Sequence, residues 1–314
     1  MACKVESLRR GLAMDLSEHH ILQNDRLRAV IAPALGGGLL RLDALEGSRG
    51  CQPILRPWSG KAANPANPAN PTERAMFVML PWCNRVSSGG FWLDGRHHDI
   101  RPNLDDQPLP IHGTGFMKVW DVVSATRDRV TLRLAEASVP PFRFEATLDY
   151  HLRSNFLKTS LHLVHQGAAP VPYGLGFHPW FCWSAGDRLQ FGAGHFVVEN
   201  QHRLPVEIRQ VKTGDHDDFV LPRQLIAGLS NGTYLDWGRS CQILRADGHC
   251  VQMTASGAAK HLHLFSRGND SGFLCLEPVS HTVDALNRPM RGDALPQVLS
   301  NNEMIETEMV ISWL

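Results

Sequence analysis

Two short segments each place an ionisable side chain directly before a proline: His178 in "GFHPW" and Glu277 in "LCLEPVS". Proline biases the residue before it toward extended backbone, which suits the end of a strand. An imidazole can donate or accept a proton near neutral pH. Glu277 follows the apolar residues 273–276, and dry surroundings would make its carboxylate a better base. The two residue types can therefore act as acid and base, although each alone also fits a purely structural role.

Two further polar segments follow apolar runs. Asn84 and Arg85 lie in "PWCNRVSSGGFWLDG", and His112 lies in "PIHGTGF". The guanidinium of Arg85 is a rigid fork that suits hydroxyls or a carboxylate. The alternatives are a surface cation with a packed stem and a turn histidine bonded to backbone. These residues become binding candidates only together with the acid–base pair.

The sixteen histidines also raise the possibility of a metal. On a strand, His261 and His263 would share a face, as the ligands of a metal-dependent β-barrel enzyme do. No carboxylate stands at a recognisable motif distance from them, so we favour a polar strand face. "LGGGLL" at 35–40 lacks the Lys-Ser/Thr of a phosphate loop and indicates a turn.

The overall composition excludes several classes of protein. Thirty-one basic residues balance thirty-one acidic ones, which leaves no basic field for nucleic acid or anionic lipid. Seven scattered cysteines without a CxxC pair indicate reduced thiols rather than a disulfide framework or a zinc site. Neither a signal peptide nor an apolar run of about 18 residues occurs. We expect a cytoplasmic protein, with a small molecule as partner and no contact with nucleic acid or membrane.

Apolar and polar residues alternate with a period of two along much of the chain. The segments "RVTLRLAEA", "FRFEATLDYHL" and "LKTSLHLVH" read as half-buried antiparallel strands, and "HLHLF" and "MVISWL" as shorter ones. Helical patterns with caps are weak. The sequence therefore predicts an all-β fold, an antiparallel β-sandwich. We expect a single domain over 1–314 with an exposed Asn-Pro loop at 62–72. Proline lacks the backbone N–H that a strand donates to its neighbour in a sheet, so this segment should not form a strand.

Five segments, in this order and over nearly the whole chain, resemble the aldose 1-epimerase (galactose mutarotase-like) family. They are "NDRLRAVIAPALGGGLLRL", "NRVSSGGFWLDG", "IHGTGF", "GLGFHPWF" and "EPVSHTVDALN". The resemblance implies a supersandwich of large twisted sheets, with no cofactor and no metal. It also implies an isomerase in which His178 is the general acid and Glu277 the general base. Arg85 and His112, with Asn84 adjacent, would hold the substrate.

The chemistry implied is the opening and reclosure of a cyclic sugar, a hemiacetal. One base must take the O1 proton while one acid protonates the ring oxygen, so imidazole and carboxylate atoms should lie within about 8 Å of each other. An aromatic side chain, Trp180 or Phe181, would offer an apolar wall. The family's substrate-binding aspartate has two candidate positions here, Asn231 and Asp236.

Several alternatives stay open from the sequence. A sugar-binding or sensor protein without turnover would keep the fold and the cleft. A hexose-phosphate epimerase would gather several Arg or Lys around the phosphate. The sequence specifies neither the sugar nor its anomer, and it fits a monomer or a homodimer.

Overall fold

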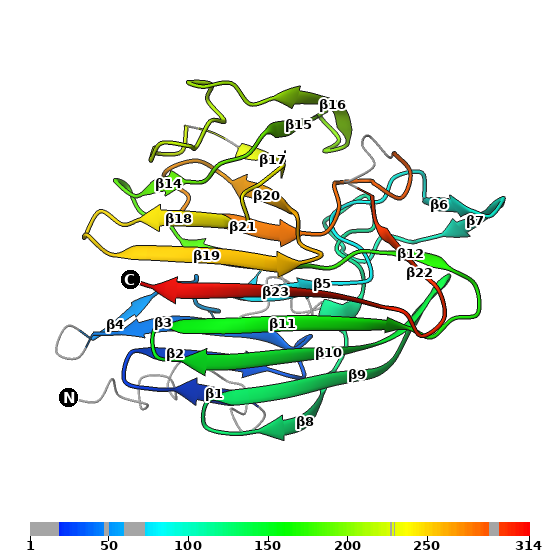
Figure 1. Cartoon of the computed structure of the whole chain (residues 1–314), viewed down its shortest axis with the longest axis horizontal. Coiled ribbons are helices and arrows are strands. Elements are labelled where there is room, and N and C mark those ends of the chain that lie inside the picture. The colour runs from blue at the N-terminus through cyan, green and yellow to red at the C-terminus, as the bar shows by residue number, and fades with distance from the viewer. Residues whose placement is uncertain (1–18, 47–49, 60–72, 227, 229, 289–294) are drawn as a thin grey trace.

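The computed structural model describes residues 19–46, 50–59, 73–226, 228, 230–288 and 295–314. The Asn-Pro segment at 62–72 lies outside these ranges. Within them the chain forms two large sheets, and every pair of hydrogen-bonded strands in these sheets is antiparallel. This arrangement confirms the predicted all-β, antiparallel architecture (Figure 1).

The larger sheet carries the residues of greatest interest. Eleven described strands belong to it, and β4 (Cys51–Pro53) pairs with β3 beside the main path. Along the path the order is β1 (His20–Gln23), β2 (Leu27–Ala32), β3 (Gly38–Leu45), β5 (Met76–Met79), β13 (Gly176–Cys182), β21 (Phe273–Val279), β20 (His261–Ser266), β17 (Ser230–Leu235), β15 (His195–Glu199) and β16 (Pro205–Gln210).

The second sheet has eight described strands, and two small two-stranded sheets stand outside both large ones. Its order is β14 (Arg188–Gln190), β18 (Ser240–Leu244), β19 (Cys250–Gly257), β23 (Met304–Trp313), β11 (Phe156–His165), β10 (Phe142–Arg153), β9 (Arg129–Val139) and β8 (Asp121–Ala125). The small pairs are β6 (Gly90–Leu93) with β7 (Arg96–Asp99) and β12 (Val171–Tyr173) with β22 (Gln297–Leu299); a 3₁₀ turn, η4, covers Gly115–Met117.

A single large apolar cluster lies between the two sheets. It joins Leu42 and Phe177 of the larger sheet to Leu148 and Leu161 of the smaller one, all with no exposed surface. Leu148 pairs directly with Leu161 in the β10–β11 register, as the period-two pattern requires. Burying one such leucine contributes roughly 1.5–3 kcal/mol. The core therefore fixes which face of each strand is left for polar chemistry.

The strands at the centre of the larger sheet differ from the half-buried type. In β20 the first four residues are buried on both faces, although the sequence pattern predicted one solvated face. Their leucines face the core, and the opposite face carries His263 within a covered polar cavity. β13 and β21 are likewise buried almost throughout. His178, His263 and Glu277 of these three strands therefore lie at the wall of a cavity and not at an open surface.

Two other sequence expectations concern turns and cysteines. Gly36 and Gly37 both adopt φ of 65° between β2 and β3, and a Cβ on Gly36 would lie 2.0 Å from the Phe116 carbonyl oxygen. The predicted glycine turn is therefore confirmed, because only glycine fits this left-handed and crowded position. No disulfide joins the six described cysteines.

Among the described residues, no helix has the length and hydrophobicity that a membrane span requires.

Candidate active site

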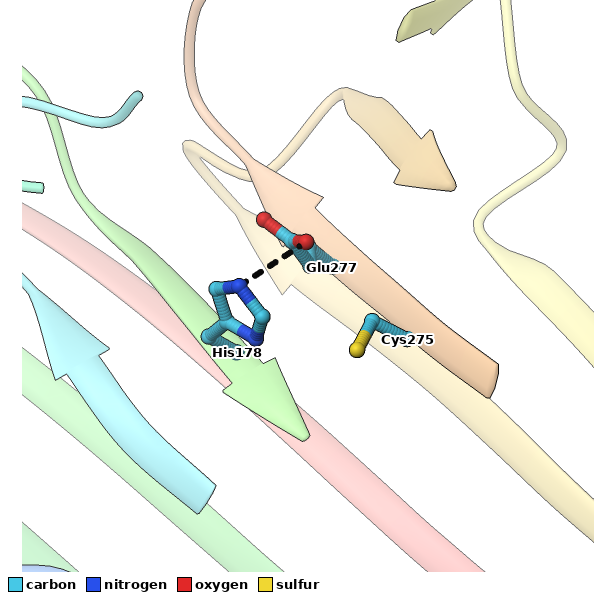
Figure 2. A group of neighbouring side chains, drawn as sticks. All are labelled: His178, Cys275 and Glu277. Atoms are coloured by element: carbon cyan, nitrogen blue, oxygen red, sulfur yellow. Dashed lines mark ion pairs between the residues drawn. The ribbon is translucent and has the colours of Figure 1, made fainter. Parts of the chain in front are cut away.

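His178 and Glu277 meet at the centre of the larger sheet. They lie on the neighbouring antiparallel strands β13 and β21, and His178 Nε2 is 3.1 Å from Glu277 Oε1 (Figure 2). Their side chains are 7% and 2% exposed. This separation is well inside the limit of about 8 Å that a shared hemiacetal requires. Two residues distant in the sequence therefore form one buried acid–base pair.

Burial acts on the two groups in opposite directions. It raises the pKa of Glu277 well above its ordinary value and lowers the pKa of His178 well below its own. Removing either group from water disfavours its charged form. The dry site therefore favours a neutral pair in which one proton is shared across the 3.1 Å contact. Such a pair can take one proton and give another without a net change of charge.

The imidazole of His178 is held between two aromatic rings. Phe77, its register partner on β5, stacks at 4.4 Å between centroids, and Trp180 stacks on His178 at 5.2 Å. The Arg56 guanidinium lies 4.0 Å from the centroid of the Trp180 ring, within the range of a cation–π contact. These contacts fix the plane of the imidazole, so that its nitrogen atoms keep one direction.

Two loops bring Asn84 and His112 to the same place. Both residues have positive φ, 55° and 61°, and two hydrogen bonds join them. The His112 N–H donates to the Asn84 carbonyl oxygen at 3.0 Å, and the Asn84 N–H donates to His112 Nδ1 at 3.2 Å. Burial lowers the pKa of His112 well below its ordinary value, so the ring is neutral. Because Nδ1 accepts, the proton is on Nε2, which is a hydrogen-bond donor.

Arg85 is oriented by its neighbours in the sequence and by the second loop. Its Nη2 donates to Gln107 Oε1 at 3.0 Å and its Nη1 to Asn84 Oδ1 at 3.3 Å. Burial lowers the pKa of Arg85, and the charge of Glu199 is the largest acidic influence that opposes this effect. The guanidinium is thus a fixed donor fork with remaining N–H groups.

These groups surround a cavity of about 190 Å³. This volume is below the roughly 300–1,000 Å³ of sites for drug-sized ligands and suits a single small ring. Polar atoms form much of its wall, so a ligand rich in hydroxyls would find both donors and acceptors. The lining residues are Phe77, Asn84, Arg85, Leu104, Asp106, Gln107, Ile111, His112, His178, Trp180, Asn231, His263, Phe265, Arg267 and Glu277.

The structure brings together all but one of the site candidates read from the sequence. Of the two aspartate replacements, Asn231 lines the cavity and Asp236 does not. Asp236 is the first residue after β17, and its carboxylate is 2.6 Å from His195 Nδ1. The separation follows from the strand pleat and from the end of β17 at Leu235.

Several lining residues carried no usable sequence signal as site residues. Gln107, Asp106 and Arg267 lie in loops without a motif, and Phe77 looks like any core aromatic. His263 was visible only as half of a possible metal pair. Its Nδ1 contacts Thr233 Oγ1 at 2.9 Å, and its Nε2 contacts Asn84 Nδ2 at 3.4 Å. It therefore supports Asn84 at the cavity wall.

Within the described ranges, one group places three potential metal ligands together: His178, Cys275 and Glu277, with ligand atoms within 4.8 Å of one another (Figure 2). Metal ligation by cysteine requires the thiolate. Burial raises the pKa of Cys275 well above its ordinary value and so keeps the thiol protonated. Without a bound cation this thiol is therefore a neutral neighbour of the His178–Glu277 pair.

The fold and the cavity together define a class of protein: a two-sheet antiparallel β-sandwich with a buried acid–base pair in a small polar cavity over one sheet. The sequence profile described as aldose 1-epimerase matches residues 18–312. The chain belongs to the aldose 1-epimerase family.

One curated protein and two solved structures are similar to this chain over most of its length. The uncharacterized protein YphB of Escherichia coli K12 is 28% identical over 294 residues, which cover 89% of this chain and 98% of YphB. The crystal structure of a putative aldose 1-epimerase from E. coli K12 superposes with a TM-score of 0.83 at 24% identity, covering 94% and 98% of the two chains. The galactose 1-epimerase structure from Lactobacillus acidophilus gives 0.71 at 16% identity, covering 94% of each chain.

Proposed function

We propose that this protein is a cofactor-independent mutarotase, an isomerase that interconverts the α and β anomers of an aldose. The observation that carries the proposal is the 3.1 Å contact between His178 Nε2 and Glu277 Oε1 at the wall of a polar cavity. The two reacting oxygens of a hemiacetal sit on one carbon. An acid and a base side by side can therefore address both at once.

In the reactive form of the pair the shared proton lies on His178, so that Glu277 is a carboxylate. Glu277 then takes the O1 proton while the His178 imidazolium protonates the ring oxygen. The C1–ring-oxygen bond breaks, and an open-chain aldehyde forms. Rotation about C1–C2 presents the other carbonyl face, and reclosure returns both protons. Each proton transfer is typically worth about 10²–10⁴-fold in rate.

Three groups would hold the sugar during this rotation. The neutral His112 donates through Nε2, and Arg85 donates through its remaining N–H groups. Trp180, stacked on His178 and covered by Arg56, contributes apolar surface to the cavity wall. Fixing the hydroxyls away from C1 keeps the open-chain form in place for reclosure.

The test uses Glu277→Gln, which keeps size and hydrogen bonding but removes the base. We expect anomer exchange, followed by NMR on a panel of neutral aldoses, to fall by about 10²–10⁴-fold. Circular dichroism should show an intact β-sandwich. The control is Glu145→Gln, which removes a carboxylate of the opposite sheet that pairs with Arg133. Absence of any acceleration by the wild-type protein would overturn the proposal.

A second candidate is supported by the guanidinium groups at the cavity. Arg267 and Arg85 line it, and Arg56 covers Trp180. Such a set suits a sugar that carries a phosphate or another anionic group. The panel should therefore include hexose 6-phosphates, and a preference for them in kcat/KM would select this candidate. Sugar binding by calorimetry without turnover would instead indicate a sensor.

A further inference from the structure

Glu199, which the proposed mechanism does not use, lies beside the catalytic cavity. It ends β15, and its carboxylate Oε2 accepts a hydrogen bond from Nδ2 of Asn231 on the neighbouring strand β17. Asn231 lines the catalytic cavity, whereas Glu199 lines a second cavity of about 190 Å³ that shares Asn231 with the first. Glu199 therefore reaches the site through a side chain that a substrate can touch.

The hydrogen bond restricts what Asn231 can offer to a ligand. With one Nδ2–H engaged by the carboxylate, the amide oxygen and the second N–H are held in fixed directions, and the oxygen is the acceptor for a substrate hydroxyl. A neutral partner at position 199 would hold the amide less firmly, because bonds to ionised acceptors are about twice as strong.

Glu199 also acts on Arg85 by its charge. Among the acidic groups that favour the charged form of Arg85, Glu199 has a larger effect than Glu277 or Asp106. The second carboxyl oxygen, Oε1, is buried. Glu199 thus acts on two of the proposed substrate-binding groups, on Asn231 through the hydrogen bond and on Arg85 through its charge.

We propose that Glu199 is a positioning residue that sets the affinity for the sugar by orienting Asn231 and by balancing the charge of Arg85. The inference rests on the proposed mutarotase function and concerns a residue that does not touch the reacting atoms. It predicts an effect on KM rather than on kcat.

The charged state of Glu199 changes within an accessible pH range. Burial raises the pKa of Glu199 to about 7, and the charges of Arg85 and Arg203 and the bond from Asn231 oppose this rise. Other titratable groups face it as well: Glu277 interacts with its charge, and His216 and Asp217 line the second cavity. Above that pH the carboxylate is ionised and holds Asn231 most firmly, so KM should fall as pH rises through about 7.

The experiment measures kcat and KM for anomer exchange between pH 5.5 and 8.5 with the best aldose of the panel. In Glu199→Gln we expect KM at pH 8 to rise about 10-fold, as for loss of a charged hydrogen bond, and kcat to change less than threefold. The change of KM near pH 7 should disappear. Glu207→Gln, at an exposed position on the adjacent strand β16, is the matched control and should behave as wild type.

Exchanging the carboxylate and the amide between positions 199 and 231 distinguishes a positioning role of Glu199 from a purely structural one. The double variant Glu199→Gln and Asn231→Asp places the amide and the carboxylate on opposite strands and keeps one bond and one charge. We expect it to recover most of the lost affinity, whereas Asn231→Asp alone, with two adjacent carboxylates, should bind most weakly above pH 7.

An unchanged KM in Glu199→Gln, or a loss confined to kcat, would overturn the inference. Failure of the mutarotase proposal is distinguishable, because wild type itself would then show no turnover. In that case the same variants are compared through the calorimetric Kd for the sugar, and an equal Kd in wild type and Glu199→Gln counts against a positioning role.

Discussion

At the scale of single residues, the site depends on what burial does to two ionisable groups. Water would leave Glu277 charged and His178 half-charged near neutrality. Their burial on β13 and β21 raises one pKa and lowers the other, so that the pair approaches neutrality through a shared proton. Proton transfer is efficient when acid and base have similar proton affinity. The buried contact thus suits both groups to a reaction in which the pair accepts one proton and donates another, so that its net charge stays the same.

The same burial predicts a link between Glu277 and stability. A carboxyl group whose pKa is raised in the folded state costs stability as pH rises above its ordinary value of 4.5. We therefore expect Glu277→Gln to unfold at higher urea concentration than wild type at pH 8. The gain should be about 1.4 kcal/mol for each unit of pKa shift. At pH 4, where the carboxyl group is mostly protonated in both states, most of the difference should be lost.

The wild-type and variant urea curves must be compared at both pH values. Glu145→Gln serves again as control, since it removes an exposed ion pair that contributes little. A Glu277→Gln variant that is equally destabilised at pH 4 and pH 8 would contradict the argument, because packing would then outweigh desolvation.

At the scale of elements, strands supply the acid–base pair and loops supply the binding groups. The turn that carries His112 passes very close to β5: a Cβ on Gly113 would lie 2.0 Å from the Leu80 carbonyl oxygen, and Gly113 has φ of 71°. The Thr114 N–H also donates to that oxygen at 2.9 Å. The close approach fixes His112 against Asn84, and only glycine permits it.

Gly113→Ala should therefore damage both stability and activity. The backbone must move to admit the methyl group, and His112 moves with it. A displacement of about 1 Å at a binding group can cost about 10²-fold in rate. Gly95→Ala is the matched control, because Gly95 has φ of 75° in an exposed hairpin with open space around its Cβ position. It should lose only about 1 kcal/mol and keep full activity.

Thermal unfolding and anomer-exchange assays on the two variants decide the point. Equal losses of stability, with full activity in both, would mean that the positive φ alone matters and that contact with Leu80 does not position His112.

The sequence predicts a strand correctly where one face of that strand is polar and exposed to solvent. Alternation in "FRFEATLDYHL" predicted β10 because its outward face meets solvent. The same rule misjudged β20, where a covered cavity replaces solvent on the second face. Periodicity reports the polarity of two surfaces and does not reveal whether a polar surface is open or enclosed. The site strands are therefore the ones that the pattern describes least well.

At the scale of the whole molecule, the fold brings together site residues that lie far apart in the sequence, and the sequence alone does not show which of them meet. His178 and Glu277 were recognisable as residue types, but their contact depends on β13 and β21 being neighbours. The choice between Asn231 and Asp236 depended on where β17 ends. Glu199 gave no signal, since its role comes from the pairing of β15 with β17. A motif identifies the chemistry that one segment can perform. The pairing and register of the strands decide which segments contribute residues to the same site.

The last prediction follows from the location of the acid–base pair, which lies on the larger sheet and not on the smaller one. Leu161 on β11 is fully buried in the core cluster and belongs to the sheet that does not carry the cavity. Leu161→Ala leaves a cavity in this core and should cost about 2–5 kcal/mol of unfolding free energy. Because the acid–base pair lies on the other sheet, kcat and KM measured well below the melting temperature should stay within about twofold of wild type, the range expected for independent sites. A loss of kcat comparable to that of Gly113→Ala would show that the core between the sheets transmits small displacements to the site, and that the smaller sheet is part of the catalytic apparatus.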